Sequence, residues 1–443
     1  MCGCNYCCSS CSSMLNLHNG GTIHVQDKSF TIVTILNECP SYTVYLVRLN
    51  QGTLYQTIGV TDINDFSNLY TLKRVRYDQF NFSQYEEEEE EETHLDQDSD
   101  KELSDYAINE IKGCQLFTDE KYIVDVLTYQ VHYERIPTLS VPSSSSTSPW
   151  IWQKTFGSLF ASKAKAPLLT SMSFTDIVFP YSCTLQDLIN KNILAPSTFF
   201  FTNENILKIL RDIAAGLSIL QEKGYSYNNL NTNTVTMAHD STTMHADLAK
   251  SVRLSDLSLI VKQPFEWNSK YFEYMNELNL SYSSPEVVSL KSKKKDRFSK
   301  NGFSSPDGST YSLSTENPPI DGFANDIWSF GCLVYCILYG LNPFERQEQL
   351  VGGSPLEDFI KRGDYSFPGD PPTYSNTGEI LEQQNEEGTT GDGSLPKAQH
   401  FWNSLIKNCL KVDPHERFTL KDLTQSLDEI ERNALQVAVP PAY

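Results

Sequence analysis

The first part of the chain carries short runs in which apolar and polar residues alternate, as they do in β-strands with one buried face. These runs lie at 23–35, where the pattern suggests paired strands, and at 43–47, 69–75, 122–127 and 174–179. One segment between them, 105–117, has its apolar residues at helical spacing instead. The pattern predicts a five-stranded sheet with one helix over residues 22–182.

The second half of the chain follows the 3.6-residue period of α-helices. An apolar stripe runs through 206–220, and Gly224 is well placed to end that helix. The segment 326–338 is apolar almost all round, which predicts a helix at the centre of a helical unit. Residues 401–434 predict two further helices. The chain as a whole therefore belongs to the α+β class.

Four segments interrupt these patterns, and we interpret them as insertions. They span about 81–104, 133–172, 289–320 and 374–396. The first is acidic, the second is Ser-rich and aromatic, and the last two are predicted to be disordered. Within the second, residues 150–165 place aromatic side chains and lysines at helical spacing. That segment fits either a membrane interface or a helix packed on the sheet.

Charge and composition limit the classes of function. The chain has 443 residues with a net charge of -21, which argues against the broadly basic face that nucleic-acid binding requires. No signal peptide is visible at the start, and no run approaches the roughly 18 apolar residues of a membrane span. We expect a cytosolic body that binds no nucleic acid.

Five of the eleven cysteines lie within the first eleven residues. They are Cys2, Cys4, Cys7, Cys8 and Cys11. The cluster is compatible with a crowded zinc site, with a disordered tail whose cysteines are incidental, or with reversible palmitoylation. We favour palmitoylation, because two or more acyl chains anchor a protein stably to a membrane. Residues 1–21 are therefore predicted to be a cysteine-rich membrane-anchoring tail.

Further motifs, in this order, resemble those of protein kinases. They are Tyr70-Thr71-Leu72-Lys73-Arg74, Phe179-Pro180-Tyr181, Lys223-Gly224-Tyr225, Asp326-Ile327-Trp328-Ser329-Phe330-Gly331-Cys332, Tyr339-Gly340-Leu341-Asn342-Pro343-Phe344-Glu345-Arg346 and Val412-Asp413-Pro414-His415-Glu416-Arg417. Within kinases the chain is similar to the numb-associated kinase family. It most resembles the branch of myristoylated and palmitoylated serine/threonine kinases and their fungal vacuolar-membrane relatives.

The resemblance implies an α+β, two-lobed protein kinase-like fold. The N-lobe would span 22–182 and the mostly α-helical C-lobe 183–443. Glu286 and Arg417 match a buried ion pair of the large lobe, and Asp326 matches a residue that fixes the backbone of the catalytic loop. These three residues have structural roles, so their presence indicates the fold and not the activity.

Six residues match nucleotide-binding positions of kinases. Lys73 would hold the α- and β-phosphates, Glu110 would pair with Lys73, and Asp256 would coordinate Mg²⁺. The others are Val44, Pro180 and Tyr181. The resemblance therefore implies that these residues support, at most, weak binding of ATP and Mg²⁺.

Two loops depart from the kinase pattern. In the loop that approaches the phosphates, Asn37, Cys39 and Pro40 stand where glycines are expected. Side chains at 37 and 39 hinder close approach of the backbone, and Pro40 has no N–H to donate. This loop is therefore predicted to hold phosphates poorly.

The catalytic loop departs further, since residues 227–229 read Tyr-Asn-Asn where kinases have His-Arg-Asp. Asn229 cannot take a proton, and loss of a general base typically costs about 10²–10⁴-fold in rate. Asn231 replaces a lysine that stabilises the transferred phosphoryl group, and Thr234 replaces an asparagine that binds Mg²⁺. Ser258 replaces the glycine that follows the Mg²⁺-binding aspartate by two residues.

Two main functions remain open. The favoured hypothesis is a membrane-tethered pseudokinase that acts as an interaction or regulatory module with weak or no ATP binding. The alternative is an active serine/threonine kinase with an atypical catalytic loop, and a third is a different enzyme on the same frame. The resemblance places the protein on the cytoplasmic face of the vacuole, Golgi or endosome, held by its acylated cysteines and the 150–165 segment.

Overall fold

The computed structural model describes residues 20–38, 42–50, 68–76, 106–135, 170–194, 201–238, 250–264, 280–290, 320–368 and 397–434. The cysteine cluster, the acidic segment 81–104 and the aromatic segment 150–165 lie outside these ranges. So do the predicted insertion 374–396 and nearly all of 289–320.

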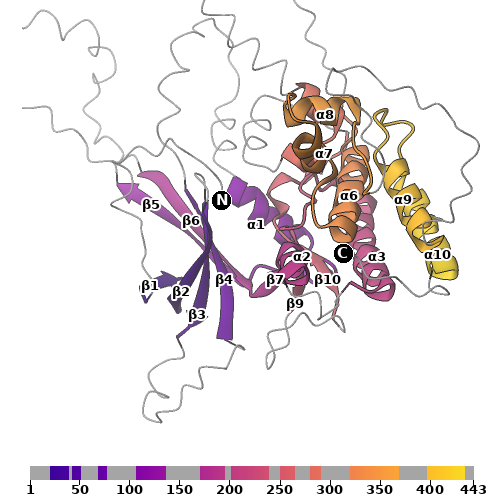
Figure 1. Cartoon of the computed structure of the whole chain (residues 1–443). Helices are drawn as coiled ribbons and strands as arrows, with labels where there is room; N and C mark the ends of the chain where they lie inside the picture. The colour runs from indigo at the N-terminus through magenta and orange to yellow at the C-terminus, as the bar shows by residue number, and fades with distance from the viewer. Residues whose placement is uncertain are drawn as a thin grey trace, which may run out of the picture.

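The first described part of the chain forms an antiparallel sheet with one helix (Figure 1). Its elements are β1 (Thr22–Val25), β2 (Lys28–Glu38), β3 (Tyr42–Leu49), β4 (Leu69–Arg76), α1 (Tyr106–Leu116), β5 (Thr128–Arg135) and β6 (Thr170–Pro180). The strand order is β1-β2-β3-β4-β6-β5. The five-stranded prediction is thus one strand short. The first apolar run forms two paired strands, β1 and β2, as its pattern suggests, but the predicted number of strands counted them as one. Gln26, in the turn between them, has a positive φ of 55°.

The predicted strand at 122–127 is wrong, because β5 begins only at Thr128. Residues Tyr122 and Val124 instead bond the backbone of Leu254 in the second half of the chain, at N···O distances of 2.8 and 2.9 Å. Ile123 and Val124 are apolar because the large hydrophobic core buries them. The insertion predicted at 133–172 is also shorter than expected, because its first and last residues belong to β5 and β6. Arg135 of β5 pairs with Thr170 of β6.

The two faces of the sheet pack differently. One face is filled by a small cluster that includes Phe30, Tyr45 and Leu72. On the other face Val75 and Ile177 join the large core, together with Ile111 of α1. Lys73 lies between Leu72 and Arg74 on β4 and pairs with Ile177 of β6 across the ladder, so its side chain lies on the face that carries α1.

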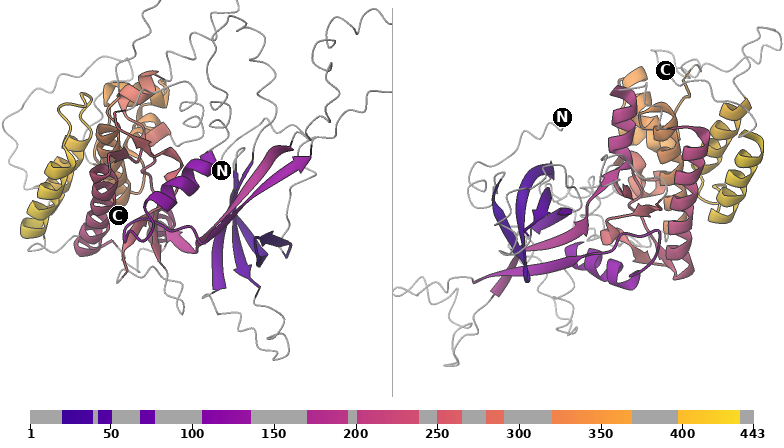
Figure 2. Two further views of the ribbon diagram at one scale, coloured as in Figure 1. Left: turned by 180° about the vertical axis from the view of Figure 1, so that it is seen from behind. Right: turned by 90° about the horizontal axis from the view of Figure 1, so that it is seen from below.

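The second half of the chain is mainly helical (Figure 2). Its helices are α2 (Leu185–Leu194), α3 (Asn203–Glu222), α6 (Gly322–Tyr339), α7 (Pro343–Val351), α8 (Leu356–Arg362), α9 (Lys397–Cys409) and α10 (Leu420–Ala434). Its short strands form two small sheets, β10-β9-β7 and β11-β8. These strands are β7 (Ser182–Thr184), β8 (Tyr225–Ser226), β9 (Val235–Ala238), β10 (Val252–Leu254) and β11 (Val261–Lys262). The described part also contains two 3₁₀ turns, η4 (Leu257–Leu259) and η5 (Leu280–Tyr282), and a helical segment at 285–290.

The helix boundaries follow the sequence signals. The side chain of Thr202 caps the start of α3, and Gly224 follows its end with a φ of 82°. Helix α6 is buried over most of its length, as the all-round apolar pattern of 326–338 predicts. Among the described helices none alone has the length and apolar composition to cross a membrane; α6 and α7 pass that test only as a pair bent by 67°.

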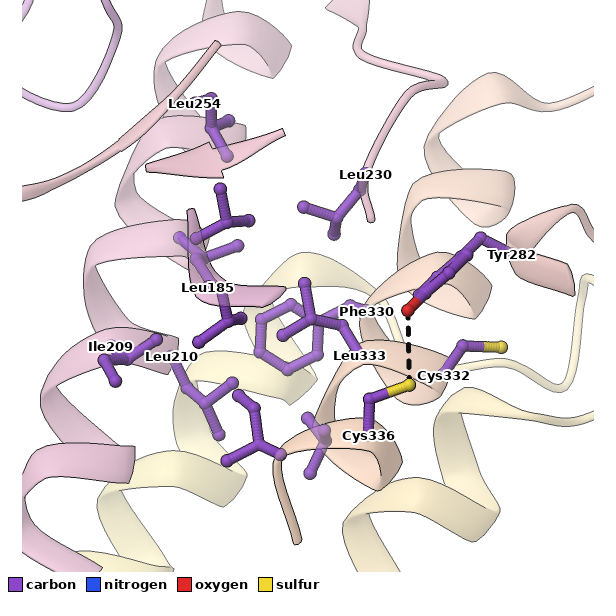
Figure 3. Packing of buried hydrophobic residues seen from close by; sticks show 14 of the residues in the cluster. Leu185, Ile209, Leu210, Leu230, Leu254, Tyr282, Phe330, Cys332, Leu333 and Cys336 are labelled. Carbon is purple, nitrogen blue, oxygen red and sulfur yellow. Dashed lines mark hydrogen bonds between the residues drawn. The ribbon is translucent and has the colours of Figure 1, made fainter. Parts of the chain in front are cut away.

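The centre of the helical part is a continuous core (Figure 3). Leu210 of α3 and the α6 residues Phe330 and Leu333 meet there. The hydroxyl of Tyr282 lies 3.2 Å from Sγ of Cys336 in the same core. This packing fixes α3 and α6, and the loop that follows α3 is consequently held on a rigid base.

Candidate active site

Three charged residues that are far apart in the sequence meet where the sheet faces the helical part. Lys73 on β4 is buried, and its Nζ lies 2.9 Å from Oε2 of Glu110 on α1. The same Nζ lies 3.0 Å from Oδ2 of Asp256, which directly precedes η4. The structure therefore brings together the three residues that the resemblance assigns to nucleotide binding. Lys73 is assigned to the phosphates, Glu110 to pairing with Lys73, and Asp256 to Mg²⁺.

An aromatic ring is a further partner of Lys73, and sequence reasoning missed it. The ring centroid of Tyr42 lies 4.9 Å from Nζ of Lys73. Tyr42 is two residues before Val44 and shares its face of β3, while Val44 pairs directly with Lys73 across the ladder. This two-residue spacing was the available signal. Such a cation–π contact contributes about 0.5–2 kcal/mol.

The buried charges influence one another's ionisation. The pKa of Glu110 is raised to about 7, chiefly by burial and to a smaller extent by the nearby carboxylate of Asp256. The positive charge of Lys73 opposes both effects on the pKa. One ammonium is thus shared between a buried carboxyl and a second, partly exposed one. Removal of Lys73 from this network would leave two carboxyl groups facing each other.

Asp256 is held by its own turn as well as by Lys73. Its backbone is in the left-handed region, with φ 55° and ψ 70°. Its Oδ1 accepts hydrogen bonds from the hydroxyl and the backbone N–H of Ser258. Ser258, which replaces the expected glycine, therefore donates two hydrogen bonds to the carboxylate of Asp256. The next residue, Leu257, packs so closely on α1 that a Cβ at Gly113 would lie 2.8 Å from its Cβ.

The loop after β8 uses its polar side chains to hold itself together. The Nδ2 of Asn229 donates to the carbonyl oxygen of Asp256 at 3.1 Å. In turn the carbonyl oxygen of Asn229 accepts from Nδ2 of Asn231 at 3.0 Å and from Oγ1 of Thr234 at 2.6 Å. These side chains are buried. The amides of Asn229 and Asn231 and the hydroxyl of Thr234, which stand where kinases have other residues, thus stabilise the loop and supply no general base.

The loop is anchored from below by Asp326 on α6. Its two carboxylate oxygens accept from the backbone N–H groups of Tyr227 and Asn228 at 2.8 and 2.6 Å. Burial raises the pKa of Asp326 to about 7, and these two N–H groups oppose that rise. The phenol of Tyr227 donates to the carbonyl oxygen of Ser255. The predicted role of Asp326 in fixing the loop is confirmed.

The predicted ion pair of the large lobe is also present. Arg417 binds Glu286 in a fork, with Nη1 and Nη2 at 2.8 and 3.0 Å from the two carboxylate oxygens. The Arg417 side chain is fully buried. Its remaining N–H groups donate to the carbonyl oxygens of Lys411, Val412 and Ala324. This bidentate ion pair connects the segment that contains Glu286 to the segment that precedes α10.

The remaining predicted nucleotide contacts lie at the edges of this site. Pro180 ends β6 and is exposed, and Tyr181, next to it, is half-buried, which raises the pKa of its phenol. Val44 is on β3 beside Lys73. Asn37 lies near the end of β2 and is exposed, while Cys39 and Pro40 lie outside the described residues.

The residues present fit a Mg²⁺–nucleotide complex poorly in this arrangement. A nucleotide would need Lys73, which in a kinase keeps its pairing with the glutamate but here also contacts Asp256 and the ring of Tyr42. A metal would need Asp256, whose Oδ1 is bonded to Ser258 and Oδ2 to Lys73. In the described ranges no group of three or more His, Cys, Asp or Glu side chains is placed to hold a metal ion. Either ligand would first have to displace a bonded partner.

Lys73 on β4, its partner Glu110 on α1 and Asp256 before a short turn define a kinase-like site on a two-lobed frame. No protein-family model matches the chain.

The curated relatives are serine/threonine protein kinases. The chain is 22% identical over 423 residues to serine/threonine-protein kinase ENV7 of Saccharomyces cerevisiae, which covers 93% of this chain and 94% of that protein. It is 24% identical over 243 residues to PLK4 of Drosophila persimilis, covering 54% of this chain and 21% of the relative. MAP kinase-activated protein kinase 2 of Drosophila melanogaster is 26% identical over 110 residues, 25% of this chain and 24% of the relative. These similarities support the protein kinase superfamily and a two-lobed kinase fold.

Proposed function

We propose that this protein is a kinase-shaped interaction or regulatory module, a pseudokinase with weak or no ATP binding. The observation that carries the proposal is the enclosure of Lys73 by Glu110, Asp256 and the ring of Tyr42. Because the glutamate stays paired with the lysine in an active kinase, the partners with which a nucleotide would compete for Lys73 are Asp256 and the ring of Tyr42. The shape of the fold is retained while the group that would hold the phosphates is occupied.

The catalytic loop supports the same proposal. Asn229 stands where a base is required, and its amide donates to the chain at Asp256. A carboxamide cannot accept a proton from a substrate hydroxyl, and that loss alone costs about 10²–10⁴-fold in rate. Asn231 and Thr234 remove further contributions to phosphoryl transfer, although the losses act on one unit and do not multiply.

We further propose that the module is tethered to a membrane by acylated cysteines at 2, 4, 7, 8 and 11. The resemblance to the palmitoylated kinase branch suggests the cytoplasmic face of the vacuole, Golgi or endosome. Replacing all five cysteines by serine should release the protein into the soluble fraction. Unchanged membrane fractionation of that variant would contradict acylation at these positions.

An active serine/threonine kinase is the alternative, and one observation favours it. Lys73 lies within 3.0 Å of both Glu110 and Asp256, so the three charged groups that a kinase needs are already assembled. If Tyr42 turns away easily, these groups could receive ATP. The alternative therefore predicts ATP-dependent transfer that is lost on Asp256→Asn.

The test of nucleotide binding is the melting temperature of the full chain with ATP, with and without Mg²⁺. We expect a small shift or none. The matched control is Lys73→Met, which removes the only side chain assigned to the phosphates and sets the level of non-specific stabilisation. A large shift with the native chain that the variant lacks would contradict weak binding.

A further inference from the structure

The turn that begins at Asp256 contains a serine whose hydroxyl is committed to that aspartate. Ser258 lies in η4 with 3% of its surface exposed. Its hydroxyl donates to Oδ1 of Asp256, and among the described residues this is the one hydrogen bond that the hydroxyl makes. Because the side chain is buried, solvent is a poor alternative partner. Ser258 therefore bonds directly to the carboxylate that the kinase resemblance assigns to Mg²⁺.

The hydroxyl adds to a weaker bond that the turn already makes. Asp256 is the N-cap of η4, and its Oδ1 accepts the backbone N–H of Ser258 at an N···O distance of 3.4 Å. That distance is longer than the usual range of an N–H···O hydrogen bond. A hydroxyl that donates to an ionised carboxylate forms a shorter and stronger bond. The side chain of Ser258, more than the backbone of the turn, therefore holds Oδ1.

Donors from three separate segments hold the acceptor atoms of Asp256. Nζ of Lys73 on β4 lies 3.0 Å from Oδ2, the hydroxyl of Ser258 bonds Oδ1, and Nδ2 of Asn229 donates to the backbone carbonyl oxygen at 3.1 Å. A Mg²⁺ ion needs carboxylate oxygens that face it at about 2.0–2.1 Å in an octahedral arrangement. In this structure the carboxylate of Asp256 serves instead as an internal counter-ion of Lys73.

The second position that the resemblance assigns to Mg²⁺ is used in the same way. The hydroxyl of Thr234 donates to the carbonyl oxygen of Asn229 at 2.6 Å and accepts the backbone N–H of Asn231 at 3.1 Å. The Thr234 side chain is buried. Both positions that would face a metal ion therefore stabilise the loop and the turn.

We propose that Ser258 determines the metal dependence of this site: it keeps Asp256 on Lys73, so that a nucleotide bound here gains nothing from a divalent cation. The inference rests on the proposed kinase-shaped site, but it concerns the metal and not the strength of ATP binding. Ser258 is a positioning residue, because it acts through Asp256. Loss of its hydroxyl should leave Oδ1 with only the long bond to the backbone N–H and make that oxygen accessible to Mg²⁺.

The test is the affinity of the full chain for ATP, measured by calorimetry with Mg²⁺ and with EDTA in its place. For the native chain the two affinities should agree within about twofold. For Ser258→Ala the affinity with Mg²⁺ should be at least about tenfold tighter than with EDTA, because a competing hydrogen bond to a charged group has been removed. Ser258→Gly, which also lacks the hydroxyl, should show the same gain.

Two outcomes of this titration would overturn the inference. One is an affinity of the native chain that depends on Mg²⁺. The other is the absence of a gain from Mg²⁺ in both Ser258 variants, including binding that is undetectable under both conditions. Tight ATP binding by the native chain that is equal with Mg²⁺ and with EDTA would contradict the proposed weak binding and still agree with the role of Ser258, so the two failures are distinguishable.

Two further variants locate the effect. Ser255→Ala is the matched control, since its hydroxyl lies just before the same turn but bonds the carbonyl oxygen of Thr234 and not the carboxylate. It should respond to Mg²⁺ like the native chain. The gain seen in Ser258→Ala should disappear when Asp256→Asn is added, because the charged ligand is then lost. A gain in Ser255→Ala, or one that survives Asp256→Asn, would show that the metal acts elsewhere and would refute the role of Ser258.

Discussion

The contact between Tyr42 and Lys73 gives the sharpest prediction. Tyr42→Ala removes a ring whose centroid lies 4.9 Å from the ammonium and keeps the rest of the cluster. If a nucleotide must displace the ring, its affinity is lowered by the free energy of that contact, about 0.5–2 kcal/mol. Removal of the ring should therefore strengthen ATP binding by about 2- to 30-fold.

The assay is the ATP-dependent rise in melting temperature, measured for each protein against its own nucleotide-free form. Tyr42→Ala is expected to melt lower without ATP, because the ring also packs against the large core. The matched control is Tyr42→Phe, which keeps the ring over Lys73 and should respond to ATP like the native chain. If Tyr42→Ala responds no more than Tyr42→Phe, the ring does not obstruct the site and the reasoning fails.

Three further predictions concern the frame and the loop. Arg417→Met should lower stability by about 3–5 kcal/mol, because it leaves Glu286 and three carbonyls without their donor; a melting temperature within a degree or so of the native value would contradict a structural role. Asp326→Asn should flatten the pH dependence of stability: the native pKa of about 7 lies above the ordinary 3.8, so this group's contribution falls as pH rises from about 4 to about 7, and the deficit of the variant should be smaller at about pH 8 than at about pH 5.5. An equal deficit at both pH values would show that Asp326 does not titrate there. Asn229→Asp should give no kinase activity and should destabilise the loop by about 1–3 kcal/mol, since it loses the donor to Asp256; recovered phosphoryl transfer would show that only the base was missing.

Much of the frame follows from local patterns. The helix over 203–222 has a strong apolar stripe, a capping threonine and a glycine after its end, and such long periodic segments are predicted reliably. The strand prediction at 122–127 was wrong because the apolar pattern of a segment is the same whether it is buried as part of a sheet or against the helical core. Its partner is Leu254, more than a hundred residues away, and only the tertiary structure identifies that partner.

The candidate site shows a similar division. The order of Lys73, Glu110 and Asp256 along the chain predicted that they belong together, and their spacing in the structure agrees. Comparison with the kinase motifs shows which glycines are missing, but it does not show which contacts the replacing side chains make. Tyr42 and Ser258 became important through their contacts with Lys73 and Asp256.

The central claim is that the kinase shape is kept while phosphoryl transfer is lost. The most direct measurement is incorporation of labelled phosphate from the γ-position of ATP by the full chain, alone and with a general protein substrate, compared with Asp256→Asn. We predict the same background for both proteins, because Asn229 supplies no base and Lys73 is enclosed. Incorporation by the native chain that disappears in Asp256→Asn would contradict the account and establish an active kinase.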